Sequence, residues 1–219
     1  SIIALQGPNS MKNLSSLYDI KLEKFHLYQD EEVMIARTGY TGELGVEIIS
    51  DAIKGLEIWN YFISKGIQPI GLAARDTLRL EAGFNLYGSD MTVENNPYDS
   101  NLEWTVDQSE QDRDYIGKKA LKHLQETKNR LVGFYTDARG VLRSGTKVSF
   151  EGGERVITSG TWSPTFKKNI GFCRVTKNFP KIGKSILRDK EIYLHFCETN
   201  FLKYLKSVSY THLRAHETE

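Results

Sequence analysis

Cysteine, excess charge and long apolar runs are all scarce in this sequence of 219 residues. The two cysteines, Cys173 and Cys197, do not fall at metal-ligand spacing, so we expect two buried free thiols in a reducing compartment. The formal net charge of +1 gives no basic excess to neutralise a run of phosphates, which argues against a general nucleic-acid binder. No apolar run approaches the roughly 18 residues that a transmembrane helix needs. No signal or transit peptide is visible.

Motifs of the common catalytic classes are also missing. The sequence contains no G-x-S-x-G, no G-x-x-x-x-G-K-[ST] and no H-E-x-x-H. We interpret His26, His123 and His195 as surface or core residues, because none has an obvious catalytic partner. We do not interpret His212 and His216 as a metal pair, although they lie at helical spacing. The residues therefore offer recognition chemistry and no catalytic constellation.

The patterns of helix and strand divide the chain near residue 128. The composition, with 26% charged residues, is that of a globular protein of one large or two modest domains. After about residue 130, short alternating strands separated by turns predict a compact β-barrel or sandwich. These strands are expected at residues 131–135, 147–150, 155–158, 170–175, 185–188 and 191–196.

Before residue 128, helices and strands are mixed, which predicts an α+β arrangement. Strands are expected at residues 2–5, 24–28, 32–37, 46–49, 67–70 and 101–107. Helices are expected just after Asn9 and at residues 52–64, 71–82 and 118–127. Ser50 or Asp51 caps the second helix, whose buried stripe is expected to hold Leu56, Trp59, Phe62 and Ile63. The last helix is expected to turn inward Ala120, Leu121 and Leu124.

The most informative stretch is the glycine-rich segment 36–47. Gly39, Gly42 and Gly45 recur at a spacing of three, and a carboxylate follows at Glu47. Glycine at this density means that the backbone turns sharply, takes φ > 0 more than once, or is approached closely by another group. Because both flanks have the pattern of strands, the segment predicts a strand, a glycine-rich turn and a second strand with Glu47 near its start.

Other groups suited to ligand recognition accompany this carboxylate. They are aromatic rings and guanidinium groups, at Tyr40, Tyr87, Trp104, Arg75 and Arg79. A carboxylate can accept two parallel hydrogen bonds from an amino-pyrimidinone edge, and an arginine offers a planar fork to a carboxylate. The set suits a flat heterocycle with a negatively charged tail. Taken alone, however, the residues favour structural turns and ion pairs, with Asp76 and Glu81 as partners of the two arginines.

Several segments resemble the aminomethyltransferase (T-protein) family of the glycine cleavage system. They are A-L-Q-G-P at 4–8, T-G-Y-T-G-E at 38–43, G-L-A-A-R-D-T-L-R-L-E-A-G at 71–83, L-Y-G at 86–88, D-Y-I-G at 114–117, G-V-L-R at 140–143 and T-S-G-T-W-S-P at 158–164, with Gly45, Glu47 and Trp104. They follow the family's order over about residues 1–206. The set is therefore more specific than any single match.

This resemblance implies a fold, a cofactor and a partner. It implies a partial folate-binding α/β core over residues 1–128 and a small C-terminal antiparallel β-barrel over residues 129–206. The family binds tetrahydrofolate in a deep central cavity, takes an aminomethyl group from the lipoyl arm of the H-protein, and forms 5,10-methylenetetrahydrofolate and ammonia. By motif, Glu47 is expected to accept the pterin amino edge, Arg75 to contact the substrate, and Tyr40 and Trp104 to line the pocket.

The resemblance implies no metal, no nucleic acid and no membrane partner. It places the protein in the cytoplasm of a bacterium, or in the mitochondrion if the source is eukaryotic. The family's catalytic Asp falls before residue 1. We therefore expect this sequence to be part of a longer chain, to be inactive alone, and to expose apolar surface that the absent part covers.

Two further features depart from the family pattern. Phe201 stands where family members place a Tyr or Arg at the folate. Residues 207–219 match neither domain and resemble translated sequencing-adapter read-through, so we expect them to be non-native.

Three alternatives remain open. One is a folate-binding relative in iron–sulfur assembly or tRNA modification, although that group has K-G-C-x-x-G-Q-E where this chain has R-D-Y-I-G-K-K-A at 113–120. Another is the folate domain of a sarcosine or dimethylglycine oxidoreductase. The third is a structural α+β fragment without a working pocket.

Overall fold

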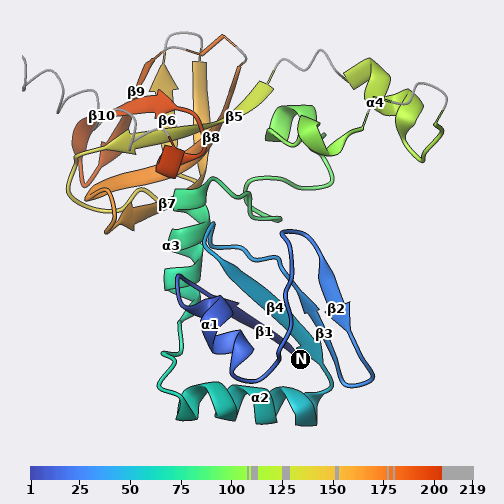
Figure 1. Cartoon of the computed structure of the whole chain (residues 1–219). Coiled ribbons are helices and arrows are strands. Elements are labelled where there is room, and N and C mark those ends of the chain that lie inside the picture. Colours follow the sequence, from blue (N-terminus) through green and yellow to red (C-terminus); the bar gives the residue numbers. More distant parts are fainter. Residues whose placement is uncertain are drawn as a thin grey trace, which may run out of the picture. The chain divides into compact units, whose positions relative to one another are not determined.

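The computed structural model describes residues 1–107, 109, 113–124, 129–150, 153–176, 178–179 and 181–203. The chain forms two compact units, Ser1–Arg79 and Leu80–Glu219, whose elements are labelled in Figure 1. The domain boundary predicted at residue 128 and the tail 207–219 lie outside the described residues. That boundary stays a prediction.

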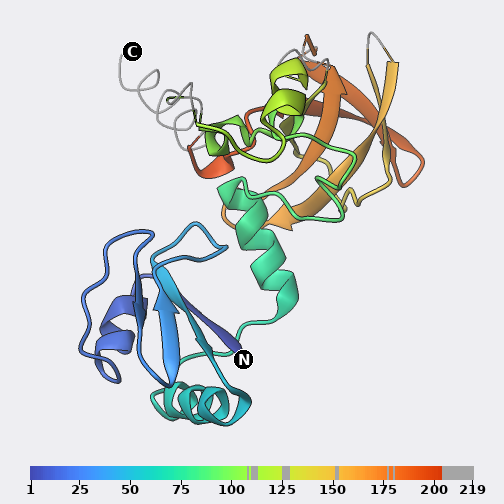
Figure 2. The ribbon, with the colours of Figure 1, turned by 90° about the vertical axis from the view of Figure 1, so that its right-hand side faces the viewer.

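The first unit is built on a four-stranded antiparallel sheet with the strand order β1-β4-β3-β2. Its strands are β1 (Ile2–Gln6), β2 (Leu27–Gln29), β3 (Val33–Ala36) and β4 (Gly45–Ser50). Alternate residues face the core, so Val33, Ile35, Val46 and Ile48 are all buried. Leu14 of α1 (Ser10–Ser15) and Phe62 of α2 (Ala52–Ser64) join the same cluster. Both helices therefore cover one face of the sheet (Figure 2).

Helix α2 has the predicted bounds but not the predicted buried face. Asp51 caps it as expected, because its carboxylate accepts a hydrogen bond from the Lys54 amide at 2.8 Å. Gly55, Ile58 and Phe62 are buried, whereas the other stripe residues are exposed, namely Leu56 by 61%, Trp59 by 44% and Ile63 by 39%. The helix is apolar on two faces, and the face that holds Gly55, Ile58 and Phe62 packs on the sheet. A Cβ at Gly55 would lie 2.0 Å from the Ser1 hydroxyl, so the helix comes close to the start of β1 at this point.

The strand predicted at residues 67–70 is wrong. Those residues form no regular element before α3 (Leu72–Ala82) begins. Pro69 has no amide hydrogen to give to a strand ladder, which is consistent with this outcome. The predicted end of α3 is confirmed, since Gly83 follows it with a φ of +87°.

The second unit contains a closed antiparallel barrel with the strand order β10-β5-β8-β7-β6-β9. The strands are β5 (Asn129–Thr136), β6 (Lys147–Phe150), β7 (Gly153–Ser163), β8 (Lys168–Thr176), β9 (Ile182–Leu187) and β10 (Lys190–Cys197). The predicted barrel is therefore confirmed, and the sandwich is excluded. Closure gives every strand two neighbours, which leaves no free edge in the barrel.

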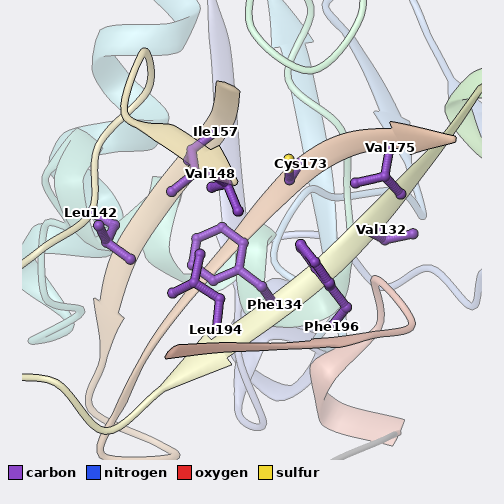
Figure 3. Packing of buried hydrophobic residues seen from close by; sticks show 9 residues of the cluster. All are labelled: Val132, Phe134, Leu142, Val148, Ile157, Cys173, Val175, Leu194 and Phe196. Carbon is purple, nitrogen blue, oxygen red and sulfur yellow. The ribbon is translucent and has the colours of Figure 1, made fainter. Parts of the chain in front are cut away.

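Branched and aromatic side chains fill the barrel. The main cluster comprises Val132, Phe134, Leu142, Val148, Ile157, Cys173, Val175, Leu194 and Phe196 (Figure 3). Phe134 is fully buried and lies over Gly171, where a Cβ would stand 2.4 Å from its ring. A second cluster includes Phe201, which is also fully buried and stacks on Phe172 with 6.0 Å between ring centroids. Phe201 is thus a core residue in this unit.

Residues between α3 and the barrel are fastened to β8 by one arginine. The strand predicted at residues 101–107 is wrong, because this region forms the short 3-10 helices η1 (Tyr98–Ser100) and η2 (Glu103–Thr105). Arg174 donates hydrogen bonds to the Asp99 carboxylate at 3.0 Å and to the Asp90 main-chain oxygen at 2.5 Å. These long-range contacts, invisible to local pattern, hold the segment in turns.

Helix α4 (Lys118–Leu124) differs from its prediction as well. None of its residues is buried, so the expectation that Ala120, Leu121 and Leu124 face a core is wrong. The rest of the predicted helix, 125–127, lies outside the described residues.

Candidate functional site

The glycine-rich segment forms the predicted strand, turn and strand, from β3 through residues 37–44 into β4. Only Gly42, at φ +75°, has the positive φ that was expected more than once among the three glycines. Gly39 and Gly45 are required for another reason. A Cβ at Gly39 would lie 2.1 Å from the Gln6 side-chain oxygen, and one at Gly45 would lie 2.5 Å from the Leu5 carbonyl. The second half of the expectation, a close approach to the main chain, is therefore correct.

Gln6 is the group that makes this approach. Its amide nitrogen donates hydrogen bonds to the carbonyl oxygens of Thr38 at 3.2 Å and of Val46 at 3.1 Å. Its amide oxygen accepts one from the Thr41 hydroxyl at 3.3 Å. Gln6 thus joins both ends of the turn to β1. Sequence reasoning missed this role, although the paired glycines at 39 and 45 were a signal that a side chain must lie between them.

Glu47 lies on the sheet face opposite the two helices. Its register partners on the neighbouring strands are Ala4 and Ala36, whose small side chains point to the same face. Oε2 of Glu47 accepts a hydrogen bond from the Thr38 hydroxyl at 2.6 Å. Within the part of the chain that the structure describes, no second group donates to this half-buried carboxylate. Thr38 therefore orients the carboxylate while Oε1 keeps its acceptor capacity.

Tyr40 and Arg75 come together in the first unit. The guanidinium carbon of Arg75, on α3, lies 4.6 Å from the centre of the Tyr40 ring, which is cation–π geometry. Arg79, one turn further along α3, is instead buried, and its Nε lies 2.8 Å from Asp76 Oδ1. Asp76, expected as a partner of the two arginines, thus pairs with Arg79, but Arg79 does not lie on the solvated face that this interpretation implied. The two arginines differ in their surroundings, since Arg75 is exposed.

The remaining aromatic candidates lie in the second unit on the surface. Trp104, in η2, is 76% exposed, and Tyr87 is 65% exposed. Neither is enclosed as a pocket wall would be. Glu81, expected as an arginine partner, is buried and accepts hydrogen bonds from the Ser163 and Thr165 hydroxyls at 2.5 and 2.9 Å. The T-S-G-T-W-S-P segment thus has a structural role here.

The described residues give no sign of a metal centre: they hold no group of three or more His, Cys, Asp or Glu side chains placed to bind an ion. Nor does any described helix have the length and apolar character to cross a membrane. Cys173 and Cys197 are free and buried, and burial raises the pKa of each thiol to about 12. Such thiols are poor nucleophiles and poor metal ligands at neutral pH.

Comparisons with known proteins agree along the chain. The family model for the GCVT N-terminal domain matches residues 1–110, and the model for the glycine cleavage T-protein C-terminal barrel domain matches residues 129–203. The chain is 40% identical to an aminomethyltransferase of Francisella tularensis subsp. tularensis (strain WY96-3418) over 95% of its own length. The same figures hold for the protein of subsp. holarctica (strain LVS).

A solved structure is similar too, that of glycine cleavage system aminomethyltransferase T from Bartonella henselae. Its TM-score is 0.81 at 31% identity, and the match covers 91% of this chain and 59% of that one. The chain spans 61% of the length of the Francisella relatives. Since one family model matches half of the chain and a second matches its barrel, the chain belongs to the glycine cleavage T-protein (aminomethyltransferase) family.

Proposed function

We propose that this chain provides part of the folate site of a tetrahydrofolate-dependent aminomethyltransferase. In that role the whole protein takes an aminomethyl group from the lipoyl arm of the H-protein and releases ammonia, and tetrahydrofolate supplies the nitrogens that accept the one-carbon unit as 5,10-methylenetetrahydrofolate. The names of the relatives support the transferase, and the geometry around Glu47 supports the folate site.

The observation that carries the proposal is how the Glu47 carboxylate is hydrogen-bonded and which side chains surround it. Thr38 fixes one oxygen, and the neighbours in register, Ala4 and Ala36, leave no bulky side chain beside it. A flat ring can therefore lie against this part of the sheet with its edge toward the carboxylate. An amino-pyrimidinone edge presents adjacent N–H donors, which match the free acceptor positions of Glu47.

Tyr40 and Arg75 complete the proposed site on the first unit. The cation–π contact holds the Arg75 side chain, while the planar guanidinium retains its donors for an acidic group of the ligand. Trp104, an exposed side chain of the second unit, remains in the proposal on its motif alone. Phe201, a buried core residue, offers the folate no polar group.

The test is a titration of tetrahydrofolate against this chain completed to the full length of its relatives. Glu47→Gln keeps the shape of the side chain but removes its charge and one acceptor. We expect the dissociation constant to rise about 10- to 100-fold, the effect of losing a charge-assisted hydrogen bond of about 1.5–3 kcal/mol.

The matched control is Glu43→Gln, which makes the same change of charge at an exposed position of the same turn. It is expected to leave affinity within about twofold, because exposed charges contribute little. Unchanged affinity in Glu47→Gln would remove Glu47 from the site. An equal loss of affinity in both variants would show that the effect comes from the change in net charge and not from a contact of Glu47.

The transfer itself is tested with aminomethylated H-protein. We expect the completed protein to release ammonia and the 219-residue chain to release none, because no residue of this chain is proposed as the catalytic acid or base. Ammonia release by the 219-residue chain alone would show that its own side chains perform the reaction.

A further inference from the structure

A separate cleft lies at one end of the barrel, where β5 and β10 stop pairing. Their ladder runs from Gly133–Cys197 to Tyr135–His195. Beyond that pair the chain segments on the two sides line a cleft of about 380 Å³. Its lining residues are Ala138, Arg139, Leu187, Arg188, Lys190, Glu191 and Ile192. The volume lies at the small end of the range for sites that bind small molecules.

The charge of this cleft is unbalanced. Arg139, Arg188 and Lys190 form no ion pair or side-chain hydrogen bond with any other residue that the structure describes. The only carboxylate in the lining, Glu191, is already paired with Lys184 at 3.1 Å. Among the described residues, three cations therefore line one small volume whose own carboxylate is already paired.

Several other cations of the barrel are paired with a carboxylate. Lys147 pairs with Glu154 at 2.9 Å, Lys184 pairs with Glu191, and Lys168 pairs with Asp137. Like charges brought together without partners repel one another, so their gathering at one cleft costs stability. Such a cost is expected where the charges serve binding.

The backbone holds these side chains at an additional cost. Arg188 and Asp189 join β9 to β10 with φ values of 51° and 60°, which is the conformation that Asn-Gly adopts most readily. Arginine in this region is uncommon. Gly140, at φ +120°, lets the neighbouring turn come close, since a Cβ there would stand 3.1 Å from Leu187 and 3.5 Å from the Arg188 guanidinium. A two-residue hairpin turn of this type needs positive φ at both positions, but it does not need an arginine at the first of them.

We propose that this cleft binds a small organic polyanion, whose phosphate or carboxylate groups are held by Arg139, Arg188 and Lys190. Guanidinium groups bind both kinds of oxyanion in a bidentate manner, and Lys190 adds a point charge. The half-buried side chains of Leu187 and Ile192 give the ligand's carbon skeleton an apolar floor. The site is independent of Glu47 and of the folate proposal.

The experiment is isothermal titration calorimetry of the 219-residue chain at 150 mM salt, about physiological strength. Citrate serves as the carboxylate probe and adenosine diphosphate as the phosphate probe. We expect at least one to bind with a Kd of about 1 mM or tighter. The probe that binds with the lower Kd shows whether the cleft prefers carboxylate or phosphate groups. Arg139→Ala, Arg188→Asn and Lys190→Ala should each weaken it roughly tenfold or more, and Asn at 188 preserves the turn.

The matched control is Lys147→Ala, which removes the same charge from a paired lysine of the same barrel. It should change the Kd by less than about twofold. Thermal melts of all four variants check that the barrel is intact. The proposal is overturned if neither probe binds, if the cleft variants bind as the parent does, or if Lys147→Ala weakens binding equally.

Discussion

The sheet of the first unit and the barrel of the second differ in how their strands are paired and covered. In the barrel every strand has two neighbours and the side chains converge inside (Figure 3). Among the described residues of the first unit, β1 and β2 each pair with one strand, and α1 and α2 pack on the same face of the sheet. Glu47 lies on the opposite face. The comparison shows that the barrel pairs all of its strands within this chain, whereas the described sheet leaves two strands with one partner each, in a chain that spans 61% of the length of its relatives.

Glycine is used differently in the two units. In the barrel, Gly171 makes room for the ring of Phe134, so the packing concerns core side chains. In the sheet, Gly39 and Gly45 make room for a polar side chain that hydrogen-bonds to the turn. The first arrangement stabilises a core, and the second shapes a surface.

The largest effect is expected where the barrel depends on one ring. Phe134→Ala removes a fully buried aromatic side chain from the centre of the cluster and should lower the free energy of unfolding by about 3–5 kcal/mol. Hydrogen exchange, followed separately for peptides of the sheet and the barrel, should show the loss in the barrel. Ile186→Ala, at a 69% exposed position of β9, is the control. Equal loss of protection in both units would break the comparison, because it would mean that they unfold together.

A smaller effect is expected in the glycine-rich turn. Gly45→Ala places a methyl group 2.5 Å from the Leu5 carbonyl and should cost about 1–3 kcal/mol, lost from the sheet alone. Gly71→Ala is the control, since a methyl group at that position would meet no atom within 4 Å. The same exchange experiment measures both. If Gly45→Ala is tolerated as well as Gly71→Ala, then Leu5 and Gln6 of β1 do not approach position 45 as closely as described.

An effect seen only at high pH concerns the two thiols, which both lie in the barrel. Burial raises the pKa of Cys173 and Cys197 from 9.0 to about 12. Above pH 9 the unfolded thiols lose protons that the folded thiols keep, so stability falls as the pH rises from about 9 to about 12. The slope is at most about 1.4 kcal/mol per pH unit for each thiol.

Denaturation curves between pH 8 and 11 measure this slope, and the double variant Cys173→Ala, Cys197→Ala should flatten it. Thiol labelling of the parent at pH 8 should be slow until the barrel opens. Rapid labelling of the folded protein would show that the reagent reaches the thiols without unfolding, which contradicts a closed barrel that buries them.

Several features of the fold could be predicted from the pattern of neighbouring residues alone. The glycine-rich turn, the position of Glu47 in β4, the Asp51 cap and the alternating barrel strands all follow from neighbouring residues. The choice of buried face on α2 did not follow, because apolar residues lie on both sides of the helix and packing on the sheet selects the side with Ile58 and Phe62.

Long-range contacts account for most of what was missed. Gln6 bonds to a carbonyl 40 residues away, and Arg174 fixes a carboxylate 75 residues away. No periodicity reveals such pairs. Within the candidate site, Glu47, Tyr40 and Arg75 could be named in advance, but the Tyr40–Arg75 contact could not. The roles of the four predicted site residues stay predictions until the titrations are made.

The contact of Gln6 with Gly39 and Gly45 has a consequence for how this protein can vary. A larger residue at position 39 is acceptable only if position 6 first becomes small, and one at position 45 must also avoid the Leu5 carbonyl. A shorter residue at position 6 leaves both turn carbonyls without their donor. The effects of substitutions at these three positions therefore depend on one another. Mutations within it should be strongly epistatic, and natural variants should change these residues together or not at all.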